Sequence, residues 1–153
     1  MTLSIRNLRF APALALLAAS GWVCAQSSEP RFQDYNDGTV KDNQTGLTWA
    51  AEDNGNDIDW PKAQQYCQSK GAGWRLPNVN ELLRLYNTEP DDTQECVGLL
   101  TCKITPKIKV SGLTMWSAEQ NTSSEAWYVY FNDGQQYAYS VSSTQGKRAL
   151  CVK

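Results

Sequence analysis

The spacing of hydrophobic and polar residues changes along the chain, and the first pattern is typical of short strands. Apolar and polar residues alternate in three brief runs, which predict strands at Arg31–Tyr35, Thr39–Lys41 and Leu47–Ala50. The two turns between the runs contain Gly38 and Gly46, and glycine favours the positive backbone angles of tight hairpins. We therefore expect a small antiparallel sheet here.

Helical spacing replaces alternation in the next part of the chain. Apolar residues recur every three or four positions within Pro61–Lys70, which predicts a helix with Cys67 on its inward face. A second helix is expected after Asn78, because Glu81 follows three residues later and the two can form a capping box. A leucine-rich run continues this second helix.

The second half of the chain is expected to form the main sheet. Residues 87–112 are polar and contain two prolines, so we expect a long irregular loop there. Four extended runs follow, at Met115–Ser117, Ala126–Asn132, Gln136–Ser140 and Ala149–Val152. Trp127, Val129 and Phe131 alternate with more polar residues, as in a strand with one buried face. The predicted fold class is α+β, with two helices and antiparallel sheets.

Residues 1–25 read as a signal peptide. Two arginines precede an apolar run that is too short to span a bilayer, and small residues suited to cleavage follow. A lipoprotein acylated at Cys24 is an alternative, although the branched Val23 stands where a lipobox needs a small residue. We expect a single domain over residues 26–153, periplasmic or secreted, with no transmembrane segment.

Charge and composition restrict the function. The chain has 14 basic and 16 acidic residues and no histidine, so it lacks the concentrated basic patch of a nucleic-acid binder. Without histidine, a Ser-His-Asp or Cys-His site is excluded, and an enzyme would depend on carboxylates or lysine. The candidate carboxylates lie in polar loops, at Asp53, Asp57, Asp59, Asp91, Asp92 and Glu95. Solvated loop acids are the commoner explanation for such residues.

Four cysteines remain beyond the leader, and an even number in an exported chain indicates two disulfides. The four cysteines allow three pairings. Cys96 and Cys102 bracket a short segment, so we expect them to pair locally, which leaves Cys67 to join Cys151. Zinc is disfavoured because the chain has neither histidine nor a Cys-x-x-Cys pair.

Calcium is the one metal that the acidic loops suggest. Residues 34–38 resemble the start of an EF-hand loop, but the acids do not alternate and the distant bidentate glutamate is missing. Four residues weakly resemble the calcium ligands of sugar-binding lectins and are weak calcium candidates: Asp91, Asp92, Asn132 and Asp133. We predict no cofactor and keep calcium as an alternative.

Several motifs together carry a family resemblance. They are Asn36–Val40, Thr45–Leu47 with Trp49, Trp74-Arg75-Leu76-Pro77, Ala126–Val129 and Cys151-Val152. In this order and spacing they resemble the C-terminal domain of bacterial collagen-like adhesins, the Lcl C-terminal domain family, a domain of unknown function. The resemblance covers essentially all of residues 26–153. It implies a C-type-lectin-like fold, related to that of formylglycine-generating enzymes, in which a disulfide joins an early helix to the last strand.

The same resemblance and the aromatic content together guide the functional prediction. We expect Trp116 and Trp127 in the core and a tyrosine surface for ligand contacts. The candidate ligand-binding residues are Lys103, Lys107, Lys109, Tyr128, Tyr130, Tyr137 and Tyr139. Glycosaminoglycan binding occurs within the family that the chain resembles. Because this chain lacks a clear basic cluster beyond the three lysines, we do not transfer that property to it.

The predicted function is an exported, non-catalytic binding or adhesion module of the bacterial envelope. Its partner is a glycan or an envelope or extracellular protein, without nucleic acid, and the oligomeric state stays open. The alternative is a carboxylate-based enzyme on a fold like that of formylglycine-generating enzymes.

Overall fold

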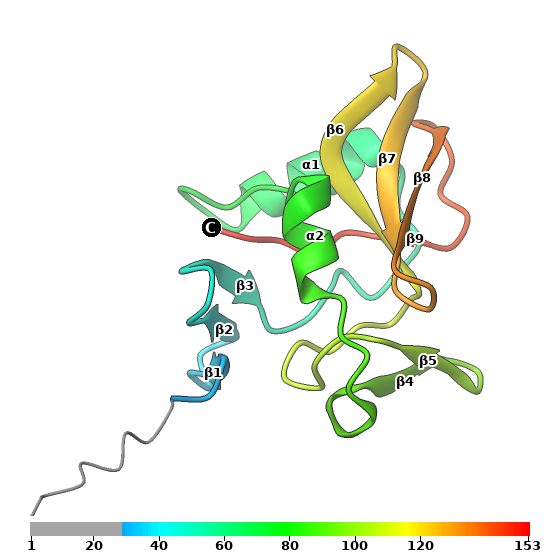
Figure 1. Ribbon diagram of the computed structural model, residues 1–153. Coiled ribbons are helices and arrows are strands. Elements are labelled where there is room, and N and C mark those ends of the chain that lie inside the picture. Colours follow the sequence, from blue (N-terminus) through cyan, green and yellow to red (C-terminus); the bar gives the residue numbers. More distant parts are fainter. Residues whose placement is uncertain (1–28) are drawn as a thin grey trace, which may run out of the picture.

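The computed structural model describes residues 29–153, which form one body of two helices and three sheets (Figure 1). The signal peptide predicted over residues 1–25, including Cys24, lies outside the described residues and stays a prediction. Within the described part, none of the helices has the length and apolar character needed to cross a membrane.

The first sheet confirms the three short strands predicted from alternation. It contains β1 (Phe32–Asp34), β2 (Thr39–Asp42) and β3 (Thr48–Ala50), in the antiparallel order β1-β2-β3. The turn glycines have the positive φ angles that the hairpins require, 85° at Gly38 and 77° at Gly46. Val40 and Trp49 face each other across β2 and β3 and are both buried.

Both predicted helices are present, and each begins at a capping residue. In α1 (Trp60–Ser69) the Asp59 side chain accepts a hydrogen bond from the Lys62 backbone N–H. In α2 (Val79–Leu85) Asn78 and Glu81 form the predicted capping box.

The Trp-Arg-Leu-Pro segment enters α2. Arg75 forms a bidentate ion pair with Glu81, because its two terminal nitrogens donate to both carboxylate oxygens at 2.8 Å. Leu76 is buried, while Trp74 is only partly buried and has the Lys153 ammonium 4.8 Å from a ring centroid. The segment is therefore structural: it joins the capping box to the core.

The prediction of an irregular loop over residues 87–112 is wrong in its middle. A short 3-10 turn (Pro90–Asp92) leads into a hairpin of β4 (Gln94–Val97) and β5 (Leu100–Cys102). Gly98, with φ of 61°, makes the turn, and the predicted Cys96–Cys102 disulfide joins the two strands. The hairpin strands are too short for an alternating pattern to stand out in the sequence, and the disulfide adds stability that so short a hairpin lacks.

The main sheet consists of β6 (Thr114–Thr122), β7 (Glu125–Tyr130), β8 (Gln135–Ser140) and β9 (Lys147–Arg148), in the order β8-β7-β6-β9. Its first three strands are antiparallel, as predicted, whereas β9 runs parallel to β6. Strand β6 extends well beyond the predicted run.

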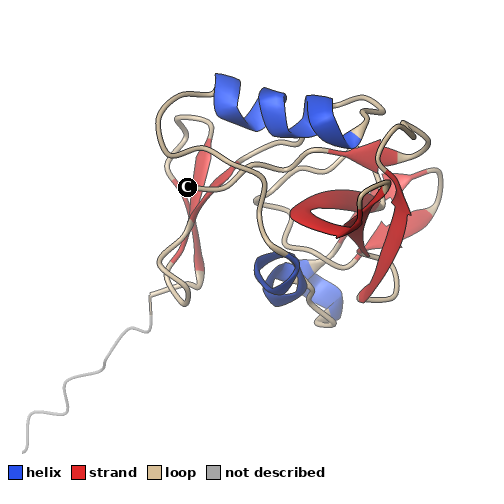
Figure 2. Ribbon diagram, turned by 90° about the horizontal axis from the view of Figure 1, so that it is seen from above, coloured by secondary structure: helices blue, strands red, loops and turns tan. Residues whose placement is uncertain are grey.

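The helices cover opposite faces of this sheet (Figure 2). On one face, residues of α2 such as Leu82 pack against Met115 and Val129. On the other face, Cys67 of α1 packs against Trp116 and other residues of the second core cluster. The sheet therefore separates two apolar clusters, because adjacent strand residues such as Met115 and Trp116 point to opposite sides.

The prediction of a strand at Ala149–Val152 is wrong. The regular pairing is limited to β9, and the following residues make isolated contacts, with Val152 bridging both Trp49 and Arg75. Because Val152 bridges each of these two residues at a single position, the segment forms no continuous ladder with either neighbour. The predicted Cys67–Cys151 disulfide is confirmed and ties α1 to this segment.

The α+β class, the two helices and the two disulfides are thus as predicted. The C-type-lectin-like fold implied by the resemblance stays a prediction.

Candidate functional site

The four candidate tyrosines lie on one face of the main sheet. The register of β7 and β8 places Tyr128 opposite Tyr137 and Ala126 opposite Tyr139, and Tyr130 is two residues from Tyr128. Directly opposed residues in an antiparallel pair project to the same side, as do residues two apart. Tyr128, Tyr130, Tyr137 and Tyr139 therefore share a surface that we call the tyrosine face.

The sequence builds this face through alternation. Trp127 and Val129 turn towards the α2 cluster, where Val129 is buried and Trp127 packs at its margin, so the intervening tyrosines turn the other way. Trp116 is fully buried as expected, whereas Trp127, which was also expected in the core, is only partly buried. Tyr137 and Tyr139 are the most solvent-exposed of the four, at 42% and 43%, because β8 forms the edge of the sheet.

A buried lysine lies beneath the tyrosine face. The Lys147 ammonium lies 4.2 Å from the Tyr128 ring centroid, 4.7 Å from that of Tyr139 and 5.9 Å from that of Trp116. Lys147 is only 7% exposed, and its ammonium donates a hydrogen bond to the Gln145 carbonyl at 3.2 Å. Such distances are those of cation–π contacts, so the charge holds the rings in place from below.

Burial lowers the pKa of Lys147, and the nearby Asp57 carboxylate opposes this shift. Sequence reasoning missed this residue. Lys147 meets the rings through a two-residue parallel pairing of β9 with β6, and no local pattern in the sequence marks that pairing.

The surroundings of two phenol groups on the tyrosine face raise their pKa values. The Tyr137 hydroxyl donates to the Asp133 carboxylate at 2.7 Å, and this hydrogen bond raises the pKa of Tyr137. Burial raises the pKa of Tyr128, with smaller contributions from Tyr139 and Asp133. The rings of Tyr128 and Tyr137 lie 5.7 Å apart, tilted by 32°. Both phenols stay neutral at neutral pH and can donate or accept hydrogen bonds.

The three candidate lysines lie elsewhere. The Lys103 ammonium lies 5.7 Å from the ring of Tyr86, which packs against the α2 cluster, on the side opposite the tyrosine face. Lys109 pairs with Glu52 at 3.4 Å, and Lys107 is exposed. Within residues 29–153, no hydrogen bond, ion pair or cation–π contact joins these lysines to the tyrosine face. Their role in binding stays a prediction.

The weak calcium candidates bond within the chain. Asp92 accepts hydrogen bonds from Asn87 and Thr105, each at 2.8 Å. Asp133 accepts from the Gln135 N–H as well as from Tyr137, and the Asn132 amide donates to the Thr101 carbonyl. Asp91 is exposed. The part of the chain that the structure describes contains no cluster of three or more metal-ligating side chains, and calcium binding stays a prediction.

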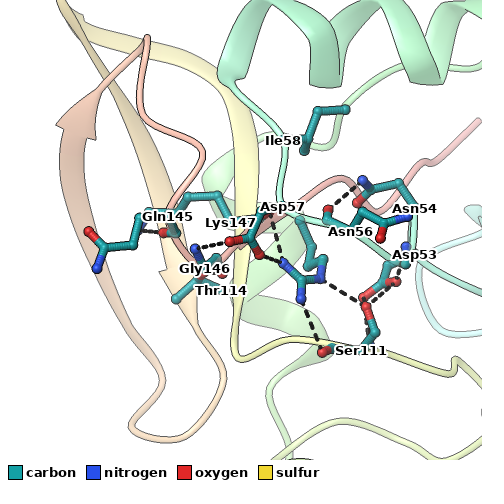
Figure 3. A network of polar contacts seen from close by, with 12 residues as sticks. Asp53, Asn54, Asn56, Asp57, Ile58, Ser111, Thr114, Gln145, Gly146 and Lys147 are labelled. Carbon is teal, nitrogen blue, oxygen red and sulfur yellow. Dashed lines mark hydrogen bonds and ion pairs between the residues drawn. The ribbon is translucent and has the colours of Figure 1, made fainter.

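Two of the loop carboxylates weighed for catalysis, Asp53 and Asp57, take part in a polar network (Figure 3). Asp53 is buried and accepts hydrogen bonds from the Ser111 N–H at 2.6 Å and from its hydroxyl at 2.8 Å. Arg148 donates to the same Ser111 hydroxyl at 2.9 Å and pairs with Asp57. The Gly146 N–H and then the Arg148 guanidinium lower the pKa of Asp57.

This network joins three distant segments. Asn54 accepts a hydrogen bond from the Ala149 N–H at 2.7 Å and adds to the contacts of Asp53 and Asp57. Asp59 caps α1, and the bond to Lys62 lowers its pKa. Asp53 and Asp57 therefore act as hydrogen-bond acceptors that hold the loop before α1 against residues 111 and 146–149. The lowered pKa values keep Asp57 and Asp59 ionised, so neither is ready to donate a proton.

The Lcl C-terminal domain matches residues 38–153, a range that contains both disulfides and the whole tyrosine face. Comparison with curated proteins gives no significant match. Because the family match extends over most of the sequence, the chain belongs to the Lcl C-terminal domain family.

Proposed function

We propose that this protein is a non-catalytic binding module of the bacterial envelope, exported to the periplasm or beyond. It contacts a glycan or an envelope protein through the tyrosine face. The observation that carries the proposal is the placement of four tyrosines on one side of the sheet edge, with the Lys147 charge fixed beneath them.

Tyrosine suits such a surface for physical reasons. Its ring offers apolar area to a sugar face or an apolar side chain, while its hydroxyl offers a hydrogen bond. Three of the rings are held in advance: those of Tyr128 and Tyr139 by Lys147, and that of Tyr137 by Asp133. Ordering them costs little on binding, and this leaves more of the contact energy for affinity.

The two disulfides support export. Structural disulfides form and persist in oxidising compartments such as the periplasm and the extracellular space. Both pairs join cysteines within residues 29–153, and the Cys67–Cys151 bridge lies in the core.

The test is an array of glycans and envelope proteins probed with the exported protein, followed by variants. Replacing Tyr137 and Tyr139 together by alanine is expected to lower the affinity for the best ligand by roughly tenfold or more, because each aromatic contact contributes about 1 kcal/mol. Tyr35→Ala removes an exposed tyrosine far along the chain, in the first hairpin, and serves as the control.

Phenylalanine variants at Tyr137 and Tyr139 separate the ring from the hydroxyl. Retained affinity in these variants would assign the contact to the ring faces. Equal affinity of the alanine double variant and the original protein, for every ligand found, would rule out the tyrosine face as the binding surface.

A further inference from the structure

Strand β8 is an open edge of the main sheet. The strand order β8-β7-β6-β9 gives it one neighbour, and it lies at the outer side of the sheet in Figure 1. Its six residues pair with β7 without interruption, from Gln135 opposite Tyr130 to Ser140 opposite Glu125. A regular edge of this kind presents a row of backbone N–H and C=O groups to a further strand.

The residues that present these groups follow from the hydrogen-bond alternation. The Val141 N–H donates to the Ser124 carbonyl at 3.0 Å, so this pair is hydrogen-bonded. Bonded and non-bonded pairs alternate in an antiparallel ladder. Gln136, Ala138 and Ser140 therefore direct their backbone groups away from β7. Within residues 29–153, the only partner of these groups is the Ser143 N–H, which donates to the Ser140 carbonyl.

Nothing in β8 blocks a further strand. Proteins commonly protect an edge with lysine, proline or a bulge. The strand sequence Gln-Gln-Tyr-Ala-Tyr-Ser has no charge and no proline, and its register with β7 has no bulge. Five of its six residues are exposed, and Ala138 is half-buried.

We propose that β8 pairs in antiparallel fashion with β8 of a second copy of this chain, about a twofold axis at Ala138. The strand is complementary to itself in that register. Ala138 lies opposite Ala138 of the second copy, and Gln136 lies opposite Ser140 of the second copy. These are the residues whose backbone groups point outward, so the Ala138 pair can exchange two hydrogen bonds. Each Gln136–Ser140 pair can form at least the bond from the Ser140 N–H to the Gln136 carbonyl, because the Ser140 carbonyl already accepts from Ser143.

The same register places the tyrosine faces of the two copies side by side. Tyr137 lies opposite Tyr139 of the second copy, and the reverse pair forms across the axis. Cross-strand aromatic pairs stabilise a sheet, and no like charges face each other within the paired strands. Pairing about a twofold axis uses the same surface on both copies and closes at a dimer. The two tyrosine faces then form one continuous ligand surface.

The test is sedimentation of the exported protein over a concentration series, in which a dimer is expected. Ala138→Lys sets two ammonium groups opposite each other and should weaken the dimer by about tenfold or more. Ala72→Lys makes the same substitution at an exposed residue in the turn after α1 and should leave the dimer intact. Ala138 lies on the side of β8 opposite the tyrosines, so ligand contacts are not removed.

A charge exchange tests the axis itself. Ala138→Glu alone should be monomeric like Ala138→Lys, and an equimolar mixture of the two variants should recover a dimer. Melting temperatures check that each variant folds. Gln136→Pro, which removes an outward backbone N–H at an exposed position without removing a bond to β7, replaces any that does not and should weaken the dimer.

Three results would each overturn the proposal. They are a monomeric wild type at every concentration, an unchanged dimer in folded Ala138→Lys, and a mixture that stays monomeric. If the wild type is monomeric, the β8 edge would instead be available to pair with an extended strand of another protein. None of them affects the tyrosine-face proposal, which the alanine variants of Tyr137 and Tyr139 test separately.

Discussion

The two disulfides stabilise very different regions. Cys67 and Cys151 are separated by 84 residues, and both are fully buried in the core cluster beneath α1. Cys96 and Cys102 are six residues apart and join the strands of the β4–β5 hairpin, whose tip residue Leu99 is 91% exposed. The first bridge fixes how distant parts of the chain meet, whereas the second fixes only a local shape.

The surroundings of each bridge explain this difference. Next to Cys151, backbone hydrogen bonds join the chain end to β3 and to the segment before α2, including Ala50 N–H to Cys151 and Arg75 N–H to Val152. The hairpin tip is loosely packed, because Val97, Leu99 and Leu100 all expose their apolar side chains. A long-range bridge therefore adds to a dense region, while the short bridge compensates for a sparse one.

The largest expected effect comes from removing the long-range bridge. Replacing Cys67 and Cys151 together by serine should lower the free energy of unfolding by about 4–5 kcal/mol, since the bridge closes a long loop of the unfolded chain. Cys67→Ser alone should lower it by about 2–5 kcal/mol. Denaturant unfolding under oxidising conditions measures both values. An unchanged transition midpoint would contradict the structural role assigned to the bridge.

A smaller effect is expected from the hairpin bridge. Replacing Cys96 and Cys102 by serine should lower the free energy of unfolding by about 2 kcal/mol, because the closed loop is short. Amide hydrogen exchange should accelerate mainly within Gln94–Cys102 and leave β6 and β7 protected. Equal losses for the two bridges, or exchange that accelerates throughout the sheet, would remove the distinction between the regions.

The stability of the protein should also depend on acid through the ion pair of Arg75 and Glu81, since the Arg75 backbone bonds to the chain end at Val152. The hydrogen bonds from Arg75 lower the pKa of Glu81 from its ordinary 4.5, with a further contribution from the Asn78 N–H and with burial opposing. A carboxyl group with a lowered pKa stabilises the fold above its ordinary pKa, and this stabilisation is lost as the pH falls through the folded-state value.

Glu81→Gln keeps the shape of the capping side chain but removes its charge. We expect a loss of about 1 kcal/mol at pH 7, because the charged partner of Arg75 is removed. When the pH is lowered below the ordinary pKa, the further loss should be smaller than in the wild type. Thermal melts as a function of pH give both quantities. The matched control is Glu89→Gln, at an exposed residue that makes no side-chain hydrogen bond within residues 29–153. Parallel pH curves for Glu81→Gln and the wild type would argue against the assignment.

The sequence was most informative where structure depends on local signals. The capping box at Asn78 and Glu81 and the glycine turns of the first sheet are set by nearest neighbours, and the structure confirms them. The shared face of Tyr128 and Tyr130 follows from the period of two in a strand. The local pairing of Cys96 with Cys102 likewise needed only their short separation.

The features that escaped prediction depend on contacts between distant residues. The β9 strand has two residues and exists only because β6 lies beside it. Val152 bridges two different segments, so its extended run never becomes a regular strand. The position of Lys147 among three rings combines both problems, since a lysine near the end of a chain ordinarily suggests a solvated residue.

The smallest effect on stability is expected at the lysines that follow the hairpin. Lys103, Lys107 and Lys109 are outside the core, and replacing all three by serine should change the free energy of unfolding by no more than about 0.5 kcal/mol per site. Their removal matters for binding, because they give the braced hairpin region a local positive charge on an otherwise acidic protein.

If the hairpin region contributes to the ligand surface, the triple variant should bind the best array ligand more weakly, and its affinity should depend less on salt. Both changes are measured by titration at two salt concentrations, since screening weakens contacts between exposed charges. Serine at Lys41, Lys62 and Lys70 removes the same charge from other elements and is the matched control. If affinity and salt dependence both match the wild type, the disulfide-braced hairpin only covers the sheet, and recognition belongs to the tyrosine face alone.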